Sequence, residues 1–167
     1  MNHAWLLRSV FNRIKDEAEC KTPLETGGLL VGYCSADDNH VVIVDVVGPG
    51  PNATHRKKTF KPDYRYHREE IHRIFTESDG QYTYLGDWHT HPGAPPYLSF
   101  IDKRALRNIA RFPHNYINRP VMIVLGGVKS SEWTVGIWRI SPLRNFFPWS
   151  KWEYIPLELT VFSDFLP

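Results

Sequence analysis

Apolar positions follow a helical period at the start of the chain and a strand-like pattern soon afterwards. Between residues 4 and 20 they recur at every third or fourth position, which predicts an amphipathic helix. The segments 27–34 and 40–47 are instead runs of apolar and β-branched residues, which predict two strands. A cluster of glycine, proline and asparagine at 48–52 then indicates a turn.

A second helix is expected from Pro62 to about Glu77. Proline suits the first turn of a helix, because its missing N–H has no partner there in any case. Apolar residues at helical spacing, Ile71, Ile74 and Phe75, would form the buried side of this helix.

The second half of the chain alternates between expected strands and one further helix. An aromatic strand begins near 82–85, and a helix from 100 to about 112 follows a proline-rich loop. Buried strands are expected at 121–125 and 133–140, with a last strand within 152–162. This order of elements predicts an α/β sandwich with a mixed central β-sheet flanked by helices.

The composition is that of an ordinary globular protein. With 167 residues, 42% of them hydrophobic and 23% charged, the chain is expected to form a single domain spanning residues 1–167. A net charge of +2 is too small to indicate nucleic acid as a partner. No run of about 18 apolar residues occurs, so no membrane span is expected.

The start of the chain and its cysteines favour a cytoplasmic protein. Charged side chains such as Arg8, Arg13 and Lys15 interrupt the N-terminal apolar residues, unlike a secretory signal peptide. Cys20 and Cys34 are too few for a disulfide framework and are not spaced as a metal-binding pair. Two reduced thiols are expected, and a single disulfide between them stays open.

The most informative chemical signal is a pair of histidines, His89 and His91, on the aromatic strand. Residues two apart on a strand point to the same side, so both rings can offer a nitrogen to one metal ion. Asp102 follows after a loop and could add a carboxylate oxygen. Two imidazoles and one carboxylate, with one position left for water, form the ligand set of a catalytic zinc site.

Ser99 and Asp102 also have a purely structural interpretation. Ser-x-x-Asp before a helical run resembles a capping box, with Ser99 as N-cap and Asp102 three residues into the helix. The two interpretations are compatible, because an aspartate fixed in the first turn is also held in the direction that a metal ligand needs. The serine hydroxyl could likewise donate to a developing oxyanion.

Together these residues resemble the JAMM metallopeptidases, also called the MPN-plus family. The pattern is a glutamate before a Gly-Gly strand, here Glu25, then His-x-His-Pro from His89, and Ser-x-x-Asp ending at Asp102. Seven residues separate His91 from Ser99, and the match is complete. The resemblance covers most of the chain and implies the same α/β sandwich.

The resemblance also implies a mechanism. One zinc ion would be held by His89, His91, Asp102 and a water, and Glu25 would take the proton of that water. Ser99 would stabilise the tetrahedral oxyanion. JAMM enzymes cut after the C-terminal residue of ubiquitin-like proteins, so the implied partner is the C-terminal tail of a conjugated protein. Without the resemblance, Glu25 would be taken for a solvated residue at a strand start.

The wider sequence context resembles the bacterial deconjugating peptidases of antiphage operons, in particular the cyclic-oligonucleotide (CBASS) systems. There the conjugated protein is a CD-NTase, a nucleotidyltransferase attached to targets through its C-terminus. Many relatives carry proline immediately before the serine, where this chain has Leu98.

Other functions share part of this pattern. A deconjugase or processing peptidase for a true bacterial ubiquitin-like or sulfur-carrier protein would carry the same motifs. A catalytically inactive MPN scaffold is a different class, which the intact Glu25, His89, His91 and Asp102 disfavour. A zinc deaminase is disfavoured because Pro-Cys-x-x-Cys is missing from the sequence.

Three further features of the sequence could bear on function. His67 and His72 imitate a His-Glu-x-x-His zinc motif but stand five residues apart, about 140° around a helix, so both are expected at the surface. The basic run 55–61 is either a solvated loop or a docking surface for an acidic partner or a C-terminal carboxylate. The aromatic residues Trp149, Trp152 and Tyr154 are expected in the core rather than at an interface.

Overall fold

The computed structural model describes residues 3–112, 117, 119–127, 133–143 and 152–163. The helices in this part of the chain are α1 (Arg8–Lys21), α2 (Tyr64–Glu77) and α3 (Phe100–Arg111). The strands are β1 (His3–Leu7), β2 (Gly27–Cys34), β3 (His40–Val47), β4 (Thr54–His55), β5 (Phe60–Lys61), β6 (Thr83–Pro92), β7 (Val121–Gly127), β8 (Thr134–Pro142), β9 (Trp152–Pro156) and β10 (Glu158–Phe162).

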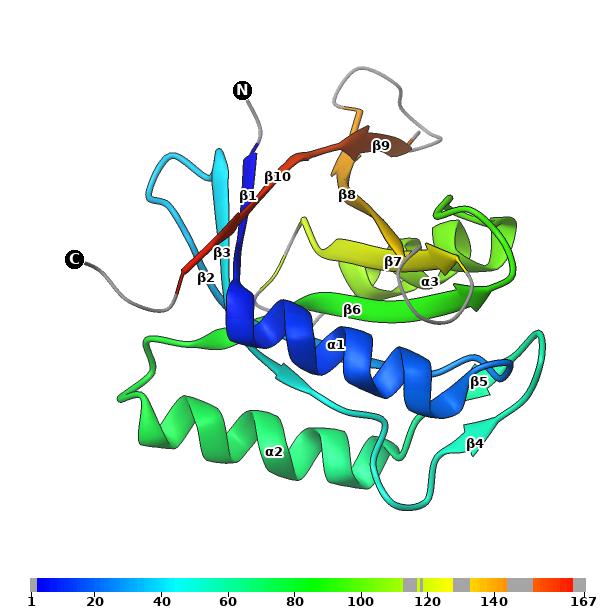
Figure 1. Ribbon diagram of the computed structural model, residues 1–167. Coiled ribbons are helices and arrows are strands. Elements are labelled where there is room, and N and C mark those ends of the chain that lie inside the picture. The colour runs from blue at the N-terminus through cyan, green and yellow to red at the C-terminus, as the bar shows by residue number, and fades with distance from the viewer. Residues whose placement is uncertain (1–2, 113–116, 118, 128–132, 144–151, 164–167) are drawn as a thin grey trace.

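Eight of these strands form one mixed, curled sheet in the order β10-β1-β3-β2-β6-β7-β8-β9 (Figure 1). Strand β1 is parallel to β3 and β10, and β6 is parallel to β7, whereas the other neighbours are antiparallel. Within the described part of the chain, the short strands β4 and β5 pair with each other alone, as a hairpin. The prediction of a mixed α/β sandwich is confirmed.

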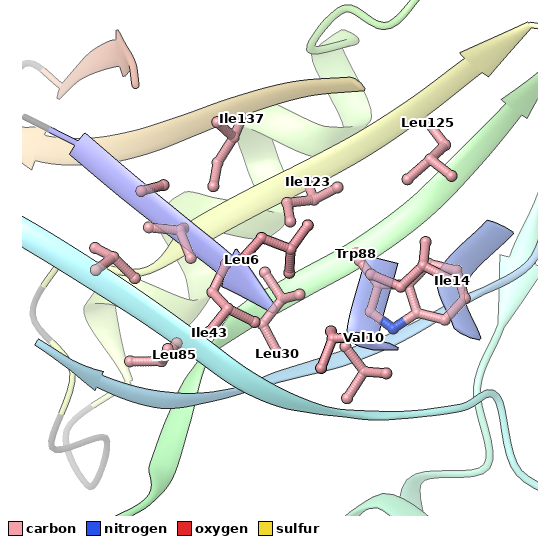
Figure 2. Packing of buried hydrophobic residues seen from close by; sticks show 14 of the residues in the cluster. Leu6, Val10, Ile14, Leu30, Ile43, Leu85, Trp88, Ile123, Leu125 and Ile137 are labelled. Carbon is pink, nitrogen blue, oxygen red and sulfur yellow. The ribbon is translucent and has the colours of Figure 1, made fainter. Parts of the chain in front are cut away.

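The helices cover both faces of the sheet, as the alternation of side chains along the strands shows. Ile123 and Leu125 pack with Val10 and Ile14 of α1 in the main core cluster, which Figure 2 shows around Trp88. The residues between them face the other way, where Val124 packs with α3. A third cluster joins α2 to β2 and β3 on that second face.

The N-terminal segment is the clearest correction to the sequence prediction. Residues 4–20 were expected to form one helix, but β1 takes the first five described residues and α1 starts only at Arg8. Ala4 and Leu6 are fully buried while their neighbours are partly exposed, which is the period of a strand. Leu7 occupies the N-cap position without a side-chain cap, so no residue type announced the boundary.

The C-terminal segment gives the second correction. One strand was expected within 152–162, but the chain forms β9 and β10, which lie at opposite margins of the sheet. Only Leu157 separates them, and its backbone N–H donates to Ile137 O at 3.0 Å. The sheet therefore curls far enough for its two margins to meet at one residue.

Helix α2 ends at Glu77 as predicted but begins only at Tyr64, after the N-cap Asp63, so Pro62 lies before the helix and not in its first turn. Two of its side chains also differ from expectation. Phe75, expected on the buried side, is 47% exposed and lies against Gly80 beyond the end of the helix. His67, expected at the surface, is only 6% exposed, and its Nε2 lies 2.8 Å from Gly48 O. His72 is exposed as predicted.

Trp152 and Tyr154 pack against the core cluster around Leu106, which favours the core interpretation of these aromatic residues. Trp149 lies outside the described residues. Cys20 and Cys34 are both free thiols, as expected.

Candidate metal centre

The two histidines of the motif lie on β6 and point to the face of the sheet that α3 covers. His89 is the register partner of Val124, which packs with α3, and His91 lies two residues further on the same side. Thr90, between them, is fully buried on the other face. Its backbone N–H donates to Thr26 O at 3.0 Å, and its hydroxyl accepts from Thr26 N at 3.0 Å. These bonds fix β6 against the chain that leads into β2.

Three potential metal-binding atoms converge at this place. The Nε2 atoms of His89 and His91 lie 3.1 Å apart, and Asp102 places Oδ1 3.2 Å from His89 Nε2 and Oδ2 3.6 Å from His91 Nε2. A tetrahedral zinc ion with bonds of about 2.0–2.1 Å would separate its ligand atoms by about 3.3–3.4 Å. The observed spacing therefore fits a small tetrahedral cation without a large rearrangement.

Asp102 reaches the histidines because helix α3 fixes its side chain. Ser99 caps the helix, with its Oγ accepting from Asp102 N at 3.2 Å, and Ser99 N donates to Asp102 Oδ2 at 2.7 Å. This is the capping box expected from the sequence. Leu98, just before it, is buried in the core cluster with Leu106. The apolar anchor and the cap together hold the carboxylate over the end of β6.

The protonation states suit metal binding. Burial would raise the pKa of Asp102, but its hydrogen bond with His89, the charge of His89 and the bonds from Ser99 lower that pKa to about 2. Burial lowers the pKa of His91, and the charge of His89 lowers it further, against a smaller opposite effect of Asp102. An ionised carboxylate and a neutral imidazole are the forms that coordinate metals.

The Nδ1 of His91 is the buried ring nitrogen that faces away from the other two candidate ligands. It has no hydrogen-bond partner among the described residues, whereas Nε2 lies toward His89 and Asp102. Buried polar atoms without a partner are rare, and those that persist often belong to functional sites. Nitrogen and oxygen ligands of this kind suit zinc.

Glu25 lies beside these candidate ligands, two residues before the start of β2. Gly27 is the register partner of His89, so the same register places Glu25 across from His91. Burial raises the pKa of Glu25; the charge of His89 lowers it and that of Asp102 raises it. A divalent cation bound nearby would lower this pKa again, so burial and the ion act in opposite directions on the carboxylate.

The glycine after Thr26 makes this close approach of strands possible. A Cβ at Gly27 would lie 2.5 Å from Trp88 O and 3.0 Å from both His89 Cβ and a ring atom of Phe60. Any larger residue would push β2 away from β6 and move Glu25 with it. The Gly-Gly part of the motif therefore has a packing reason in this fold.

The hairpin β4–β5 forms hydrogen bonds with the backbone of Glu25. No feature of the sequence indicated this contact. Glu25 N donates to Arg56 O at 2.8 Å, and the Nδ1 of His55 lies 2.9 Å from Glu25 O. The His55 ring also packs on Phe60, with ring centroids 5.4 Å apart. In the sequence His55 is part of the basic run 55–61, and no local pattern distinguishes a histidine whose ring bonds a backbone carbonyl 30 residues away.

Two other neighbours of the ligands were also missed. The ring of Tyr97 lies 5.1 Å from that of His91, centroid to centroid. Asp87, two residues before His89, accepts a hydrogen bond from Tyr84 OH at 2.7 Å, and burial raises its pKa. The aromatic strand before the histidines could have suggested the second contact.

The decoy histidines take no part in this centre. His67 and His72 are not among the residues that could share a metal ion within the described part of the chain, where His89, His91 and Asp102 form the candidate cluster.

Among the described residues, no helix has both the length and the apolar character needed to cross a bilayer.

Comparison with known proteins identifies relatives of this chain. Residues 7–141 match the family described as prokaryotic homologs of the JAB domain. The chain is 41% identical to the probable metalloprotease y4qB of Sinorhizobium fredii over 124 residues, which are 74% of this chain and 75% of that protein.

Two further relatives carry a more specific name. Over 111 residues the chain is 33% identical to a CD-NTase/cGAS isopeptidase of Enterobacter hormaechei, covering 66% of this chain and 60% of that protein. Over 102 residues it is 31% identical to a CD-NTase/cGAS isopeptidase of Escherichia coli, covering 60% and 64%. The matched region thus spans less than two thirds of either isopeptidase.

Among solved structures, protein DSY2949 of Desulfitobacterium hafniense superposes with a TM-score of 0.61 at 15% identity. The match covers 96% of this chain and 95% of that one. At this identity the likeness supports the fold and says nothing of the chemistry.

Proposed function

This chain belongs to the prokaryotic JAB domain family, and from that premise we propose that it is a zinc-dependent isopeptidase. The observation that carries the proposal is the convergence of His89, His91 and Asp102 at the ligand spacing of a tetrahedral metal. An inactive scaffold would have no use for an ionised carboxylate and two imidazoles turned toward one another. The relatives named metalloprotease and isopeptidase support a hydrolytic enzyme.

In this proposal His89, His91 and Asp102 would hold the zinc ion. Zinc bound there would polarise the scissile carbonyl and lower the pKa of a coordinated water to about 7. Thr90 keeps the two histidines in register through its bonds to Thr26, and Ser99 keeps Asp102 in its direction. Positioning of this kind reduces the reorganisation that the reaction requires.

Glu25 is the proposed general base and acid. Its carboxylate takes a proton from the attacking water as the oxygen bonds to the carbonyl carbon, and then delivers a proton to the leaving amine as the C–N bond breaks. Its partial burial makes it a stronger base than an exposed glutamate. Ser99 Oγ accepts from Asp102 N and still has its own proton to donate to the carbonyl oxygen as negative charge develops.

The proposed substrate is a protein conjugated through its C-terminus to another protein. A CD-NTase is the first choice, because three relatives carry the name CD-NTase/cGAS isopeptidase. The enzyme would then reverse conjugation in an antiphage system of the bacterial cytoplasm. A ubiquitin-like or sulfur-carrier protein is the alternative that the experiment must separate.

The metal assignment can be tested by elemental analysis of purified variants. The wild-type protein should contain about one zinc ion per chain. His89→Ala should lose this zinc, because only two of the three proposed protein ligands would remain. Glu25→Gln should keep the zinc while cleavage falls about 10²- to 10⁴-fold, the usual contribution of a general base. Zinc retained at full stoichiometry in the combined His89→Ala and Asp102→Ala variant would show that the metal binds elsewhere.

The substrate assignment needs a separate measurement. A reporter would be fused to the C-terminus of a CD-NTase and, in parallel, to a bacterial ubiquitin-like protein. Intact mass should show release after the native C-terminal residue with the wild-type enzyme and none with Glu25→Gln. Cleavage of the ubiquitin-like fusion alone would select the alternative substrate, and scattered cuts in unfolded casein alone would make the enzyme a general protease.

A further inference from the structure

A shallow groove of about 640 Å³ runs along α3, the helix that also carries Asp102. Its lining combines positive charge with apolar surface. The arginines are Arg104, Arg107 and Arg111, and the apolar side chains are Phe100, Leu143 and Trp152.

The arginines lie on one side of the helix because they are spaced by three and four residues. Among the described residues, none of them forms an ion pair with a carboxylate; the ion pairs of arginine there involve α1, α2 and the β2–β3 turn. Like charges at this spacing destabilise a helix. The dipole of α3 favours Arg111 in the last turn but gives Arg104 no such benefit. The cluster thus lacks an acidic partner in the described part of the chain.

The groove also has a direction relative to the metal centre. Phe100 and Ile101, in the first turn of α3, are 74% and 69% exposed beside the capping box. Arg111 lies nine residues beyond Asp102, about 14 Å along the helix axis at 1.5 Å per residue. At about 100° per residue, the three arginines stand about 140–180° around α3 from Asp102, so the groove lies on the outer side of the helix that carries the centre.

We propose that this arginine groove binds an acidic segment of the protein whose bond is cleaved. The rise of about 14 Å alone corresponds to about four extended residues, and the chain must also pass around the helix, so the carboxylates lie more than about four residues from the cleaved bond. Guanidinium groups bind carboxylates through two parallel hydrogen bonds, and Arg111, 5.7 Å from the Trp152 ring, is already oriented by that ring. A net charge of +2 provides no wider positive field of the kind that nucleic-acid binding uses.

That the acidic segment belongs to the cleaved protein rests on the proposed function. The first test therefore measures binding without cleavage. The probe is a fluorescein-labelled ten-residue peptide with four consecutive glutamates, titrated by anisotropy into zinc-loaded Glu25→Gln enzyme. Adding Arg104→Gln and Arg107→Gln should weaken binding by about tenfold, because surface ion pairs are removed. The matched control, Arg8→Gln with Arg68→Gln, removes the same charge from exposed sites on α1 and α2 and should bind as before. Thermal melting checks that both double variants are folded.

A second test uses cleavable peptides that differ only in glutamate or glutamine downstream of the cleaved bond. The acidic peptide should have the lower KM at equal kcat, and 0.5 M salt should reduce the difference since exposed charges are screened. The groove variant should abolish the preference. If the anisotropy titrations gave equal dissociation constants for the acidic and the neutral peptide, the proposal would be overturned. Tighter binding of a ten-nucleotide single strand to the groove than of the acidic peptide would overturn it as well. Binding without cleavage of any peptide would instead leave the groove standing and refute the proposed function.

Discussion

Ser99 combines a structural and a proposed chemical task in one hydroxyl group. Its Oγ accepts from Asp102 N as the cap of α3, and its hydroxyl proton remains for the substrate oxygen. An alanine variant would mix the two losses, because removal of an N-cap costs about 1 kcal/mol. Glycine is the sharper probe, since it replaces a cap at a cost of only a few tenths of a kcal/mol.

We therefore predict that Ser99→Gly keeps nearly its full stability but loses about 10²- to 10³-fold in kcat. Urea unfolding and steady-state kinetics on the same preparation measure the two effects. A normal kcat together with a stability loss above about 1 kcal/mol would assign Ser99 to capping alone.

At the scale of elements, the hairpin β4–β5 positions the proposed base. Because Glu25 O is an acceptor, His55 Nδ1 must carry the proton of the hydrogen bond between them. We predict that His55→Ala lowers kcat about ten- to a hundredfold with KM little changed, since misplacement of a catalytic group reduces the rate. His55→Asn should recover most of kcat, because its side-chain N–H lies where Nδ1 lies.

The recovery by asparagine separates positioning from general damage to the hairpin. Zinc content is the second readout and should match the wild type in both variants. If alanine and asparagine lowered kcat equally, the hydrogen bond to Glu25 would have no part in the rate.

Helix α2 carries a histidine whose burial makes its packing sensitive to pH. Burial lowers the pKa of His67 below 6.5, against a smaller opposite effect of its bond to Gly48 O and of the Asp63 charge. The unfolded chain therefore binds a proton at a higher pH than the folded chain does. The stability that His67 provides is present above about pH 6.5 and is lost as the pH falls toward the folded-state pKa.

We predict that the free energy of unfolding falls more steeply between pH 7.5 and pH 5 for the wild type than for His67→Gln. Glutamine can keep a donor toward Gly48 O but does not titrate. Urea denaturation at several pH values measures the difference, and the other histidines cancel in the comparison. Parallel curves would mean that His67 is neutral in both states over this range.

At the scale of the whole molecule, the sequence indicated the strands and helices wherever the apolar residues followed one regular period. The strand β3 is nearly all β-branched, and the cap at Ser99 announced α3. The boundary at Leu7 lacked a capping side chain, so β1 merged with α1 in the prediction. At Leu157 the chain passes from one edge strand of the sheet, β9, to the other, β10. This step depends on the curl of the complete sheet, which a short stretch of sequence does not reveal.

The candidate centre was predictable for a related reason. Alternation along β6 places His89 and His91 on one side, and the capping box fixes Asp102, so local rules bring the three candidate ligands together. The contacts of His55 and Tyr97 depend on segments that meet only in three dimensions. Residue types alone could not show them.

The joined margins of the sheet predict the effect of losing β10. A chain that ends at Pro156 would leave the outer backbone of β1 unpaired, because β10 pairs with β1 along its whole length. Exposed strand edges promote self-association. We expect this variant to form oligomers in size-exclusion chromatography, whereas a chain that ends at Ser163 should elute like the wild type. A monomeric, fully folded Pro156 variant would contradict this expectation.

The pairing of β1 with β10 also affects the order in which the protein can form. His3 is matched with Glu158, so the first described strand stays incomplete until residues 158–162 have left the ribosome. Contacts at such sequence separation form slowly, because a long loop must close before they contribute. Throughout synthesis β1 can pair on one side only, with β3, and its other side stays open to chaperones or to a neighbouring nascent chain.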